Sequence, residues 1–517
     1  MPLIREFGIP VLHWGRRSLE KYWPIISKQV IDRFGRGPFI KAPEVKEVLN
    51  FCFEWTLGEF RRLTVQQHNL GFYKTVAGLY ENTIEVQGFL SMNEPLSYIK
   101  EQDFVTNRNG LRLILERACE LDLTGTGEVA DITDEQAQVI EDLLYLTTWI
   151  WGFAQAIAHQ QLLGEVDELH IDSDDTMRIN RKRHYDDFIR SLRQEMIRVG
   201  QEAIHDIEGV GELTRAFKQC MGIDLHQDAG FVPEPEGIHP YAEYPLLVDV
   251  PYDEIIQRLA NTSKVEIEKV RIFCAGWTLS RDTMPGLEKV IRKPGGQARH
   301  MYRPILVWNV DGQRRAICAP QRWSESLTLM AVNALQWREV PPEWLANDKF
   351  KDFVNRKHDA HDKILEDRVE LILKAIFPHY HRNPRLLQLQ SGKHLRFDVA
   401  GLGEVDFLFL SHKERKLYVV DCKYHRPRHD MIGYRMDQSN FESDYEPKLE
   451  KKIQWFEGKL SEVAVHFSLR HNGESINLEG YSVEGIFVVN TLTMYCYKGR
   501  FRAQSILQFE EWARDHN

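Results

Sequence analysis

The 517-residue sequence predicts an α/β protein with a mainly α N-terminal domain, a small α/β middle module and a C-terminal α/β domain. Helical hydrophobic spacing dominates residues 1–227, and a hairpin pattern with a central Asp-Gly pair lies within residues 228–350. Residues 351–517 alternate between strand and helix patterns in the order αβββαβ. That order favours a mixed sheet flanked by helices.

Residues 1–227 are expected to be helical because their apolar residues recur at helical spacing over several long segments. One segment, 143–163, has no formally charged residue over a length that could span a bilayer. Its threonine, glutamine and histidine side chains would be costly in lipid, so we expect a helix buried in a protein core. We assign residues 1–350 a role in recognition, regulation or assembly.

Residues 228–350 are expected to form a linker and a small module. The stretch 228–245 is rich in proline and glycine and lacks periodic apolar residues, which is typical of a linker or a long ordered loop. The segment 303–320 has the pattern of a β-hairpin with Asp-Gly at its turn, and helical spacing follows at 321–337.

Residues 351–517 are expected to form one domain around a mixed sheet. Its predicted elements are a helix at 361–377, strands at 385–399, 404–410 and 417–424, a helix at 443–467, strands at 483–490 and 493–498, and a helix at 507–517. The second and third of these strands are apolar on both faces. Strands of that kind are typically central ones that helices cover.

Composition and motifs exclude several classes of protein. The net charge of −10 argues against a protein coated in nucleic acid, but residues 351–517 carry 26 Lys+Arg against 25 Asp+Glu and could approach a polyanion. Neither GxxxxGK nor GxGxxG occurs, so an ATP-driven motor is not expected. The seven cysteines form no CxxC pair and the N-terminus lacks a signal-peptide pattern, so we expect a cytoplasmic protein without a membrane partner.

The stretch "GLGEVDFLFLSHKERKLYVVDCKYHR" places acids in two adjacent strands. Pairing Leu410 with Leu417 across the polar loop sets a register, and that register puts Asp406 directly opposite Asp421. Lys423 lies on the same face, because alternate residues of a strand share a face. Opposed like charges are destabilising unless a cation lies between them. Lys423 would supply part of that compensation, and a divalent metal would supply more.

Hard cations such as Mg²⁺ bind through one or two carboxylates together with water and phosphate oxygens. A metal held in this way can activate a water and neutralise charge on a phosphodiester, while a nearby lysine orients the nucleophile or stabilises the developing charge. The two aspartates and the lysine therefore indicate phosphodiester hydrolysis.

Residues 355–500 resemble the PD-(D/E)xK nuclease superfamily, which has the restriction-endonuclease-like fold. The resemblance implies that Asp406 and Asp421 are catalytic metal-binding acids and that Lys423 is the catalytic lysine. It further implies the backbone carbonyl of Cys422 as a metal ligand and Mg²⁺ (or Mn²⁺) as the cofactor. The sequence departs from the most familiar form by having Val before Asp406, where proline might stand, and Asp for Glu in the triplet.

The helix before the strands often contributes a glutamate in this superfamily. Glu366 is our first choice for this catalytic acid, and Glu370, one turn later on the same face, is the alternative. On the helix after the triplet, Lys448 and Lys452 either supply an auxiliary polar group, as in some relatives, or face solvent.

Basic residues around the triplet could line a groove for the phosphate backbone. The candidates are Arg382, Arg385, Lys393, Arg396, Arg426 and Arg428. The alternative is a solvated face of mixed charge. The neighbouring histidines His379 and His381 are interpreted as surface residues, since they have no acidic third ligand nearby in the sequence.

The sequence thus favours a metal-dependent nuclease that acts on DNA. By analogy with other large proteins that carry such a domain, a place in bacterial restriction or anti-phage defence is expected. Two alternatives remain open: a nuclease that acts in DNA repair or on RNA, and a nucleic-acid-binding or scaffold protein that keeps the fold without cleaving. A homo-oligomer or separate partner subunits are compatible with each of these.

Overall fold

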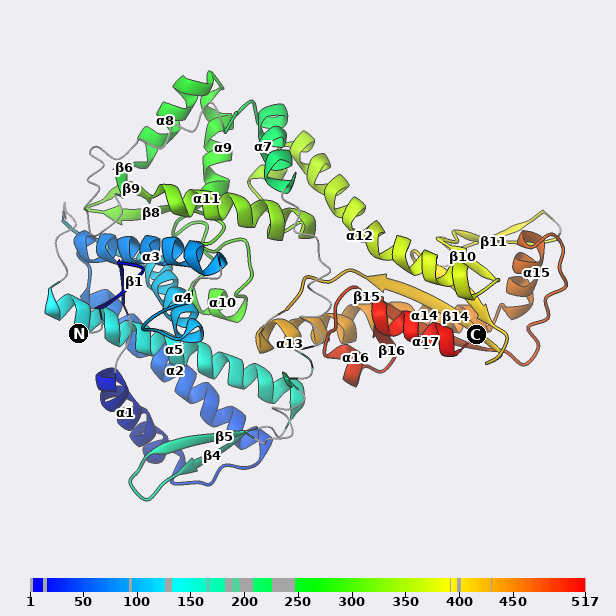
Figure 1. Ribbon diagram of the computed structural model, residues 1–517, viewed down its shortest axis with the longest axis horizontal. Coiled ribbons are helices and arrows are strands. Elements are labelled where there is room, and N and C mark those ends of the chain that lie inside the picture. The colour runs from blue at the N-terminus through cyan, green and yellow to red at the C-terminus, as the bar shows by residue number, and fades with distance from the viewer. Residues whose placement is uncertain are drawn as a thin grey trace. The chain divides into compact units, whose positions relative to one another are not determined.

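The structure of the chain is a computed structural model, and Figure 1 shows its helices and strands. It describes residues 3–12, 16–92, 95–125, 133–164, 167–181, 189–190, 192, 194, 208–225, 247–390, 392–397, 401–428 and 430–516. Within these ranges the fold is mixed α/β, and its sheets do not close into a barrel. Two compact units are present. Unit 1 is Met1–Lys182 with His205–Lys357, and unit 2 is Arg183–Ile204 with His358–Asn517.

Unit 1 begins with the helical region that the sequence predicts. Its helices are α1 (Arg16–Phe34), α2 (Ala42–Gln66), α3 (Leu70–Ser91), α4 (Glu101–Ala118), α5 (Asp134–Leu163) and α7 (Glu208–Met221). Two hairpins accompany them, β1 (Leu3–Glu6) with β2 (Ile9–Leu12) and β4 (Asp167–Ile171) with β5 (Met177–Arg181). Helix α5 contains the charge-poor segment 143–163, is mostly buried and packs against α2. None of the described helices is long and apolar enough to cross a membrane.

The predicted middle module is part of unit 1 and not a separate body. Its sheet has the order β3-β8-β9-β6, and β7 also pairs with β8. The strands are β3 (Asp122–Leu123), β6 (Val248–Pro251), β7 (Thr278–Leu279), β8 (Ile305–Val310) and β9 (Gln313–Cys318). Because β3 precedes the predicted break at 228–245 and the other strands follow it, residues from both sides of the break build one sheet. The break itself lies outside the described residues.

The predicted hairpin in this region is confirmed. Strands β8 and β9 are antiparallel, with Val310 opposite Gln313. Between them, Asp311 and Gly312 have φ angles of 49° and 80°. Two consecutive left-handed residues form the tight turn that Asp-Gly favours in a two-residue hairpin loop.

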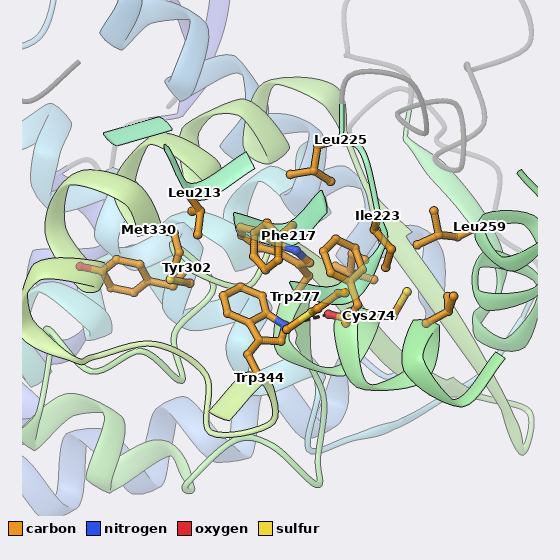
Figure 2. Packing of buried hydrophobic residues seen from close by; sticks show 14 of the residues in the cluster. Leu213, Phe217, Ile223, Leu225, Leu259, Cys274, Trp277, Tyr302, Met330 and Trp344 are labelled. Carbon is orange, nitrogen blue, oxygen red and sulfur yellow. Dashed lines mark hydrogen bonds between the residues drawn. The ribbon is translucent and has the colours of Figure 1, made fainter. Parts of the chain in front are cut away.

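Aromatic residues form the core around this sheet in unit 1 (Figure 2). The surrounding helices are α8 (Tyr252–Ser263), α9 (Ile267–Trp277), α10 (Leu287–Arg292) and α11 (Pro320–Leu329), followed by a π-helical turn (Met330–Ala334) and 3₁₀ turns (Leu335–Trp337 and Trp344–Ala346). The rings of Trp277 and Trp344 lie 4.8 Å apart, and that of Phe217 lies 4.9 Å from Trp344. These three side chains join α7, α9 and the last 3₁₀ turn.

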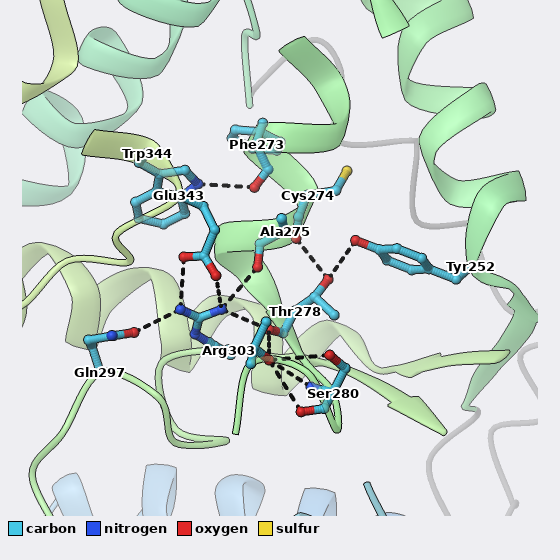
Figure 3. A network of polar contacts seen from close by, with 11 residues as sticks. Tyr252, Phe273, Cys274, Ala275, Thr278, Ser280, Gln297, Arg303, Glu343 and Trp344 are labelled. Carbon is cyan, nitrogen blue, oxygen red and sulfur yellow. Dashed lines mark hydrogen bonds and ion pairs between the residues drawn. The ribbon is translucent and has the colours of Figure 1, made fainter. Parts of the chain in front are cut away.

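A buried arginine fixes the same region through polar contacts (Figure 3). Arg303 donates to both carboxylate oxygens of Glu343 at 3.0 Å, to Gln297 Oε1 at 2.8 Å and to two backbone carbonyls at 3.0 Å. Those carbonyls belong to Ala275 and Thr278, at the end of α9. Burying a charged side chain is costly unless it is paired and hydrogen-bonded, and Arg303 is both.

Unit 2 is built on a five-stranded mixed sheet with the order β10-β13-β14-β15-β16. The first three strands are antiparallel, and β15 and β16 continue in parallel with β14. The strands are β10 (Tyr380–Arg382), β13 (Phe407–Ser411), β14 (Lys416–Lys423), β15 (Ser482–Val489) and β16 (Arg502–Ser505). The helices are the part of α12 (Asp348–Ile376) from His358 onward, α13 (Met431–Asn440), a π-helical turn (Phe441–Tyr445), α14 (Glu446–Glu457), α15 (Leu460–Arg470), α16 (Tyr495–Lys498) and α17 (Ile506–Asp515).

Helices cover both faces of this sheet, as the apolar pattern of its central strands predicts. Phe407 and Phe409 of β13 pack in one cluster with residues of α12 and α17. Leu408 and Leu410 pack in the other cluster with residues of α14 and α15. Alternate side chains of β13 and β14 therefore pack toward α12 on one face of the sheet and toward α14 on the other.

Two predicted strands of this domain are wrong. The described part of the segment 385–399 does not enter the main sheet, and its strands β11 (Leu386–Gln388) and β12 (His394–Arg396) pair with each other as a two-stranded sheet. The edge position is taken by β10. The segment 493–498 turns into the short helix α16, and the strand at that edge is β16. Burial of Met494 and Tyr495 overrides the β propensity of their neighbours.

We expect Gly276→Ala to destabilise unit 1. A Cβ at this position of α9 would lie 2.0 Å from Trp344 Nε1, and the tryptophan is held by its neighbours and by a hydrogen bond to the carbonyl of Phe273. Overpacking of a core typically costs about 1–3 kcal/mol of unfolding free energy. Urea denaturation of the purified variant measures this loss.

Gly58→Ala is the matched control, because a Cβ at this position in the interior of α2 meets no atom within 4 Å. Replacing an interior helical glycine by alanine stabilises by about 0.5–1 kcal/mol where space allows. Equal effects of the two substitutions would contradict the packing described for Trp344.

Candidate functional site

The pairing of β13 with β14 follows the register that the sequence predicts. Leu410 lies opposite Leu417, and Phe407 lies opposite Val420. One further step along the ladder sets Asp406, directly before β13, against Asp421 in β14. The two side chains are only 9% and 3% exposed. Two carboxylates therefore lie together in the interior of unit 2, on the face that α14 covers.

Asp421 receives two lysines. Lys423 Nζ donates to its Oδ1 at 2.6 Å, and Lys452 Nζ of α14 donates to its Oδ2 at 3.2 Å. Burial raises the pKa of Asp421, but the charges and hydrogen bonds of the two lysines outweigh burial and hold this pKa below its usual range. Asp421 is therefore a carboxylate at neutral pH.

Asp406 is compensated much less. Its Oδ2 accepts a hydrogen bond of 2.5 Å from the backbone N–H of Cys422. Burial and then the charge of Asp421 raise the pKa of Asp406, and Lys423 and Lys452 offset this only in part. The two acids thus titrate far apart, which is the pattern that a pair of closely placed carboxylates gives when one ionises and the other holds a proton.

Lys423 and Lys452 differ in their access to solvent. The side chain of Lys423 is 24% exposed, and its Nζ lies 5.0 Å from the ring centre of Tyr445 in the π-helical turn. Burial alone would lower the pKa of Lys423, but Asp421 and Asp406 raise it above its usual value, so the ammonium stays charged. The contact of Lys423 with Tyr445 is a cation–π interaction. Lys452, in contrast, is only 4% exposed.

Lys452 is one of two lysines that the sequence left open between an auxiliary role and a solvent-facing one. The structure places Lys452 inward, while Lys448 is exposed and paired with Asp444. The signal was present in the spacing, because Leu449, Lys452 and Phe456 recur at helical intervals and form the buried side of α14. A lysine within an apolar stripe needs a buried acid as its partner.

Neither of the two candidate helix acids bonds the aspartate pair directly. Glu366 and Glu370 of α12 both bind Arg382 of β10, which also pairs with Asp367. Glu366 additionally accepts from Asn383 Nδ2 at 3.2 Å. Within the described ranges, no group of three or more His, Cys, Asp or Glu side chains is placed to hold a metal ion. The sequence offered no signal for Asn383, whose role depends on where β10 ends.

The basic candidates differ in how far they are exposed. Arg382 is bound by the acids of α12, and Arg428 contacts both carboxylate oxygens of the buried Asp437 at 2.9 and 3.1 Å. These two are structural ion pairs in the described state. Arg426 is half-buried. Arg385, Lys393 and Arg396 are exposed on and beside the β11–β12 hairpin.

The interpretation of His379 as a surface residue is wrong. Its side chain is buried, its Nδ1 lies 2.8 Å from His412 Nε2, and its Nε2 lies 3.1 Å from Glu474 Oε2. His381 is half-buried and contacts His466 Nε2 at 2.9 Å. These histidines tie the end of the sheet to α15 and the turn that follows it.

Comparisons of the chain with protein-family models, with curated proteins and with solved structures found no match. The interpretation of the site therefore depends on its own geometry and on the resemblance of its residues to the PD-(D/E)xK pattern. In that geometry, the aspartate pair, Lys423 and Lys452 are together, and Glu366 bonds Arg382 and Asn383 beside them.

We expect Asp406→Asn to stabilise the protein in the absence of divalent metal, and to do so only at higher pH. The folded pKa of Asp406 is raised above its unfolded value of about 3.9, so its proton stabilises the folded state fully below that value and this contribution is lost as pH rises through the folded pKa. Asparagine cannot ionise and avoids this loss. With a folded pKa of about 7, the gain is up to about 4 kcal/mol, at 1.36 kcal/mol per unit of pKa difference.

Urea denaturation in EDTA at a series of pH values from 4 to 8 measures this effect. The control is Asp444→Asn, which changes an exposed aspartate of the π-helical turn. A gain from Asp406→Asn that is as large at pH 4 as at pH 8 would contradict the raised pKa that burial and the charge of Asp421 give Asp406.

Proposed function

We propose that unit 2 is a divalent-metal-dependent phosphodiester hydrolase that cleaves nucleic acid, with DNA as its substrate. The observation that carries this proposal is the buried pair Asp406 and Asp421, in register on neighbouring strands, with Lys423 beside them and partly exposed. Support also comes from the mixed sheet covered by helices on both faces, which fits the restriction-endonuclease-like fold that the sequence resembles.

The residues fit a divalent cation. Asp406 is a buried carboxylate that faces a second carboxylate and has one backbone N–H as its hydrogen-bond donor. A cation between the two acids would remove the repulsion that raises the pKa of Asp406 and would favour the ionised form of both. Carboxylate and carbonyl oxygens suit Mg²⁺ or Mn²⁺, so Asp406, Asp421 and the backbone carbonyl of Cys422 would hold the ion. When bound, it activates water and neutralises charge on the phosphodiester.

The two lysines on Asp421 would have different tasks. Both carboxylate oxygens of Asp421 are bonded to lysines in the described state. Lys423 reaches solvent, so it can leave Asp421 and contact the attacking water or the phosphate oxygens. Lys452 is buried on α14 and keeps Asp421 ionised and oriented. We therefore assign catalysis to Lys423 and positioning of Asp421 to Lys452.

The β11–β12 hairpin is the best candidate for contact with the nucleic-acid backbone. It leaves the sheet after Asn383, whose backbone N–H donates to the carbonyl of Asp406, and the chain returns at Leu402, shortly before Asp406. The hairpin therefore occupies the stretch of chain between Asn383 and Asp406, two residues that the sheet holds together. The sequence from Arg385 to Arg396, which includes Lys393, contains no Asp or Glu. Exposed basic side chains of this kind position a phosphate backbone.

Unit 1 is proposed to supply recognition, regulation or assembly, and the biological context is proposed to be restriction or anti-phage defence. Both statements extend the analogy made from the sequence. The main alternative is a protein that binds nucleic acid without cleaving it, which is favoured because Glu366 pairs with Arg382 and does not form a three-acid metal group with the aspartate pair in the described residues.

We expect the purified protein to cut DNA in Mg²⁺ or Mn²⁺ and not in EDTA. Asp421→Asn and Lys423→Met should each lower the cleavage rate by about 10²–10³-fold, the usual effect of removing one group that stabilises a transition state electrostatically. Supercoiled, linear and single-stranded DNA and RNA are compared in the same gel assay, so the substrate class is read directly.

Lys448→Met is the matched control, because Lys448 lies on the same helix as Lys452 but is 60% exposed and paired with Asp444. It should leave the rate unchanged. Cutting that persists in Lys423→Met would exclude this site. Salt-sensitive binding without any cutting, in Mg²⁺ and in Mn²⁺, would favour the non-cleaving alternative.

We expect the triple variant Arg385→Gln, Lys393→Gln, Arg396→Gln to bind DNA more weakly and with a smaller salt dependence. Each lost phosphate contact removes about 0.9 from the slope of log K against log salt on duplex DNA. Fluorescence anisotropy at several salt concentrations measures the slope. Lys413→Gln, in the turn between β13 and β14 at the opposite end of the strands, is the control. An unchanged slope in the triple variant would remove the hairpin from the interface.

A further inference from the structure

Asn383, the residue after β10, bonds at once to the backbone of Asp406 and to the side chain of Glu366. Its backbone N–H donates to the backbone carbonyl of Asp406 at 2.7 Å, which continues the β10–β13 ladder one residue past the pair of Arg382 and Phe407. Its side-chain Nδ2 donates to Glu366 Oε2 at 3.2 Å. Asn383 thus links Asp406, at the start of β13, to the helix that carries Glu366.

The backbone of Asn383 is suited to this bridge. Its φ angle is 46°, in the left-handed region that non-glycine residues seldom adopt and that asparagine tolerates better than most. Residues held in this region cost free energy and cluster at functional sites. Because the ladder holds the main chain of Asn383 against Asp406, the direction of its amide is fixed, and that amide reaches Glu366.

Arg382 binds both candidate helix acids, whereas the side chain of Asn383 bonds Glu366. Its guanidinium donates to Glu366 at 3.2 Å and to Glu370 at 2.7 Å, and it pairs with Asp367 at 2.6 Å. Glu366 Oε2 accepts from both Arg382 and Asn383, whereas Glu370 and Asp367 bind the arginine. Glu366 is also the least exposed of the three acids, at 18%.

Glu366 and Asp421 belong to opposite faces of the sheet. Glu366 is on α12, which packs on the face of Phe407 and Phe409, and Asp421 lies on the face that α14 covers. The end of β10 joins the two sides, because Asn383 bonds both the backbone of Asp406 and the side chain of Glu366.

We propose that Asn383 is a positioning residue that keeps the Glu366 carboxylate beside Asp406, and that Arg382 is the counter-ion which Glu366 gives up when a divalent cation binds. This inference rests on the proposed function. A cation at Asp406 and Asp421 attracts Glu366, whose oxygen is shared between Arg382 and Asn383. The neutral amide does not oppose the cation, so its bond to Glu366 can remain. Arg382 keeps Glu370 and Asp367 as partners, so its release leaves no unpaired charge.

This proposal makes the two neighbouring residues act in opposite directions on metal affinity. Loss of the Asn383 amide frees Glu366 to follow Arg382 and weakens binding. Loss of the Arg382 charge removes a competitor for Glu366 and strengthens binding. A residue that served stability alone would not produce effects of opposite sign.

The experiment measures Mn²⁺ binding to the full-length protein by titration calorimetry, with the thermal midpoint of each variant recorded alongside. Asn383→Gly keeps the backbone donor and permits the left-handed φ but lacks the amide. It should weaken binding about tenfold, the lower end of the effect of a group that orients a metal ligand. Glu366→Gln should weaken binding at least as much, Glu370→Gln should change it little, and Arg382→Gln should strengthen it.

Asn472→Gly is the matched control, since Asn472 is an exposed asparagine of unit 2 with a φ of 55°. Its Mn²⁺ affinity should equal that of the unaltered protein. If the unaltered protein binds no Mn²⁺, the proposed function and this inference both fail. If it binds Mn²⁺ but Asn383→Gly behaves as Asn472→Gly does, or Glu370→Gln weakens binding more than Glu366→Gln, the inference is overturned while the proposed function stands.

Discussion

The antiparallel register of β13 and β14 is the constraint on which the candidate site depends. Both strands are buried on both faces, so a slip of one residue would move every side chain from the α14 side to the α12 side. Burial therefore fixes the register, and the fixed register brings Asp406 to Asp421. Three residues bond this pair: Lys452 from α14, Lys423 from β14 and Asn383 from the end of β10.

The negative charges of Asp406 and Asp421 are compensated unequally by their hydrogen-bond donors. This difference, more than the number of cations nearby, sets the ionisation of the pair. Both oxygens of Asp421 are bonded to lysines, while Asp406 has a backbone N–H and the opposing charge. An even distribution would have given two stable carboxylates and an ordinary buried ion-pair network. The observed one leaves Asp406 with a raised pKa, and a ligand of positive charge would stabilise the folded protein at this point.

The sequence was sufficient for the parts of unit 2 that depend on local pattern. The register of the hairpin followed from Leu410, Leu417 and the loop between them, because strands with two buried faces allow one solution. The edge strands β10 and β16 could not be found in this way, since each has three or four residues and too little pattern. Nor could the partners of Arg382 and Arg428, because a paired arginine and an exposed one have the same appearance in a sequence.

Unit 1 shows why the aspartate pair differs from ordinary buried charge. There, Glu116 bonds to Arg299 at 2.7 Å and Glu81 bonds to Arg322 at 2.6 Å, and Arg303 has Glu343 and two carbonyls around it (Figure 3). Each of these carboxylates has an arginine of its own, which is the arrangement that a stable interior requires. Asp406 instead has a second carboxylate in the position where those acids have an arginine. A core selected for stability alone would place an apolar side chain or a cation there, and this difference is the physical reason for proposing a functional site at the pair.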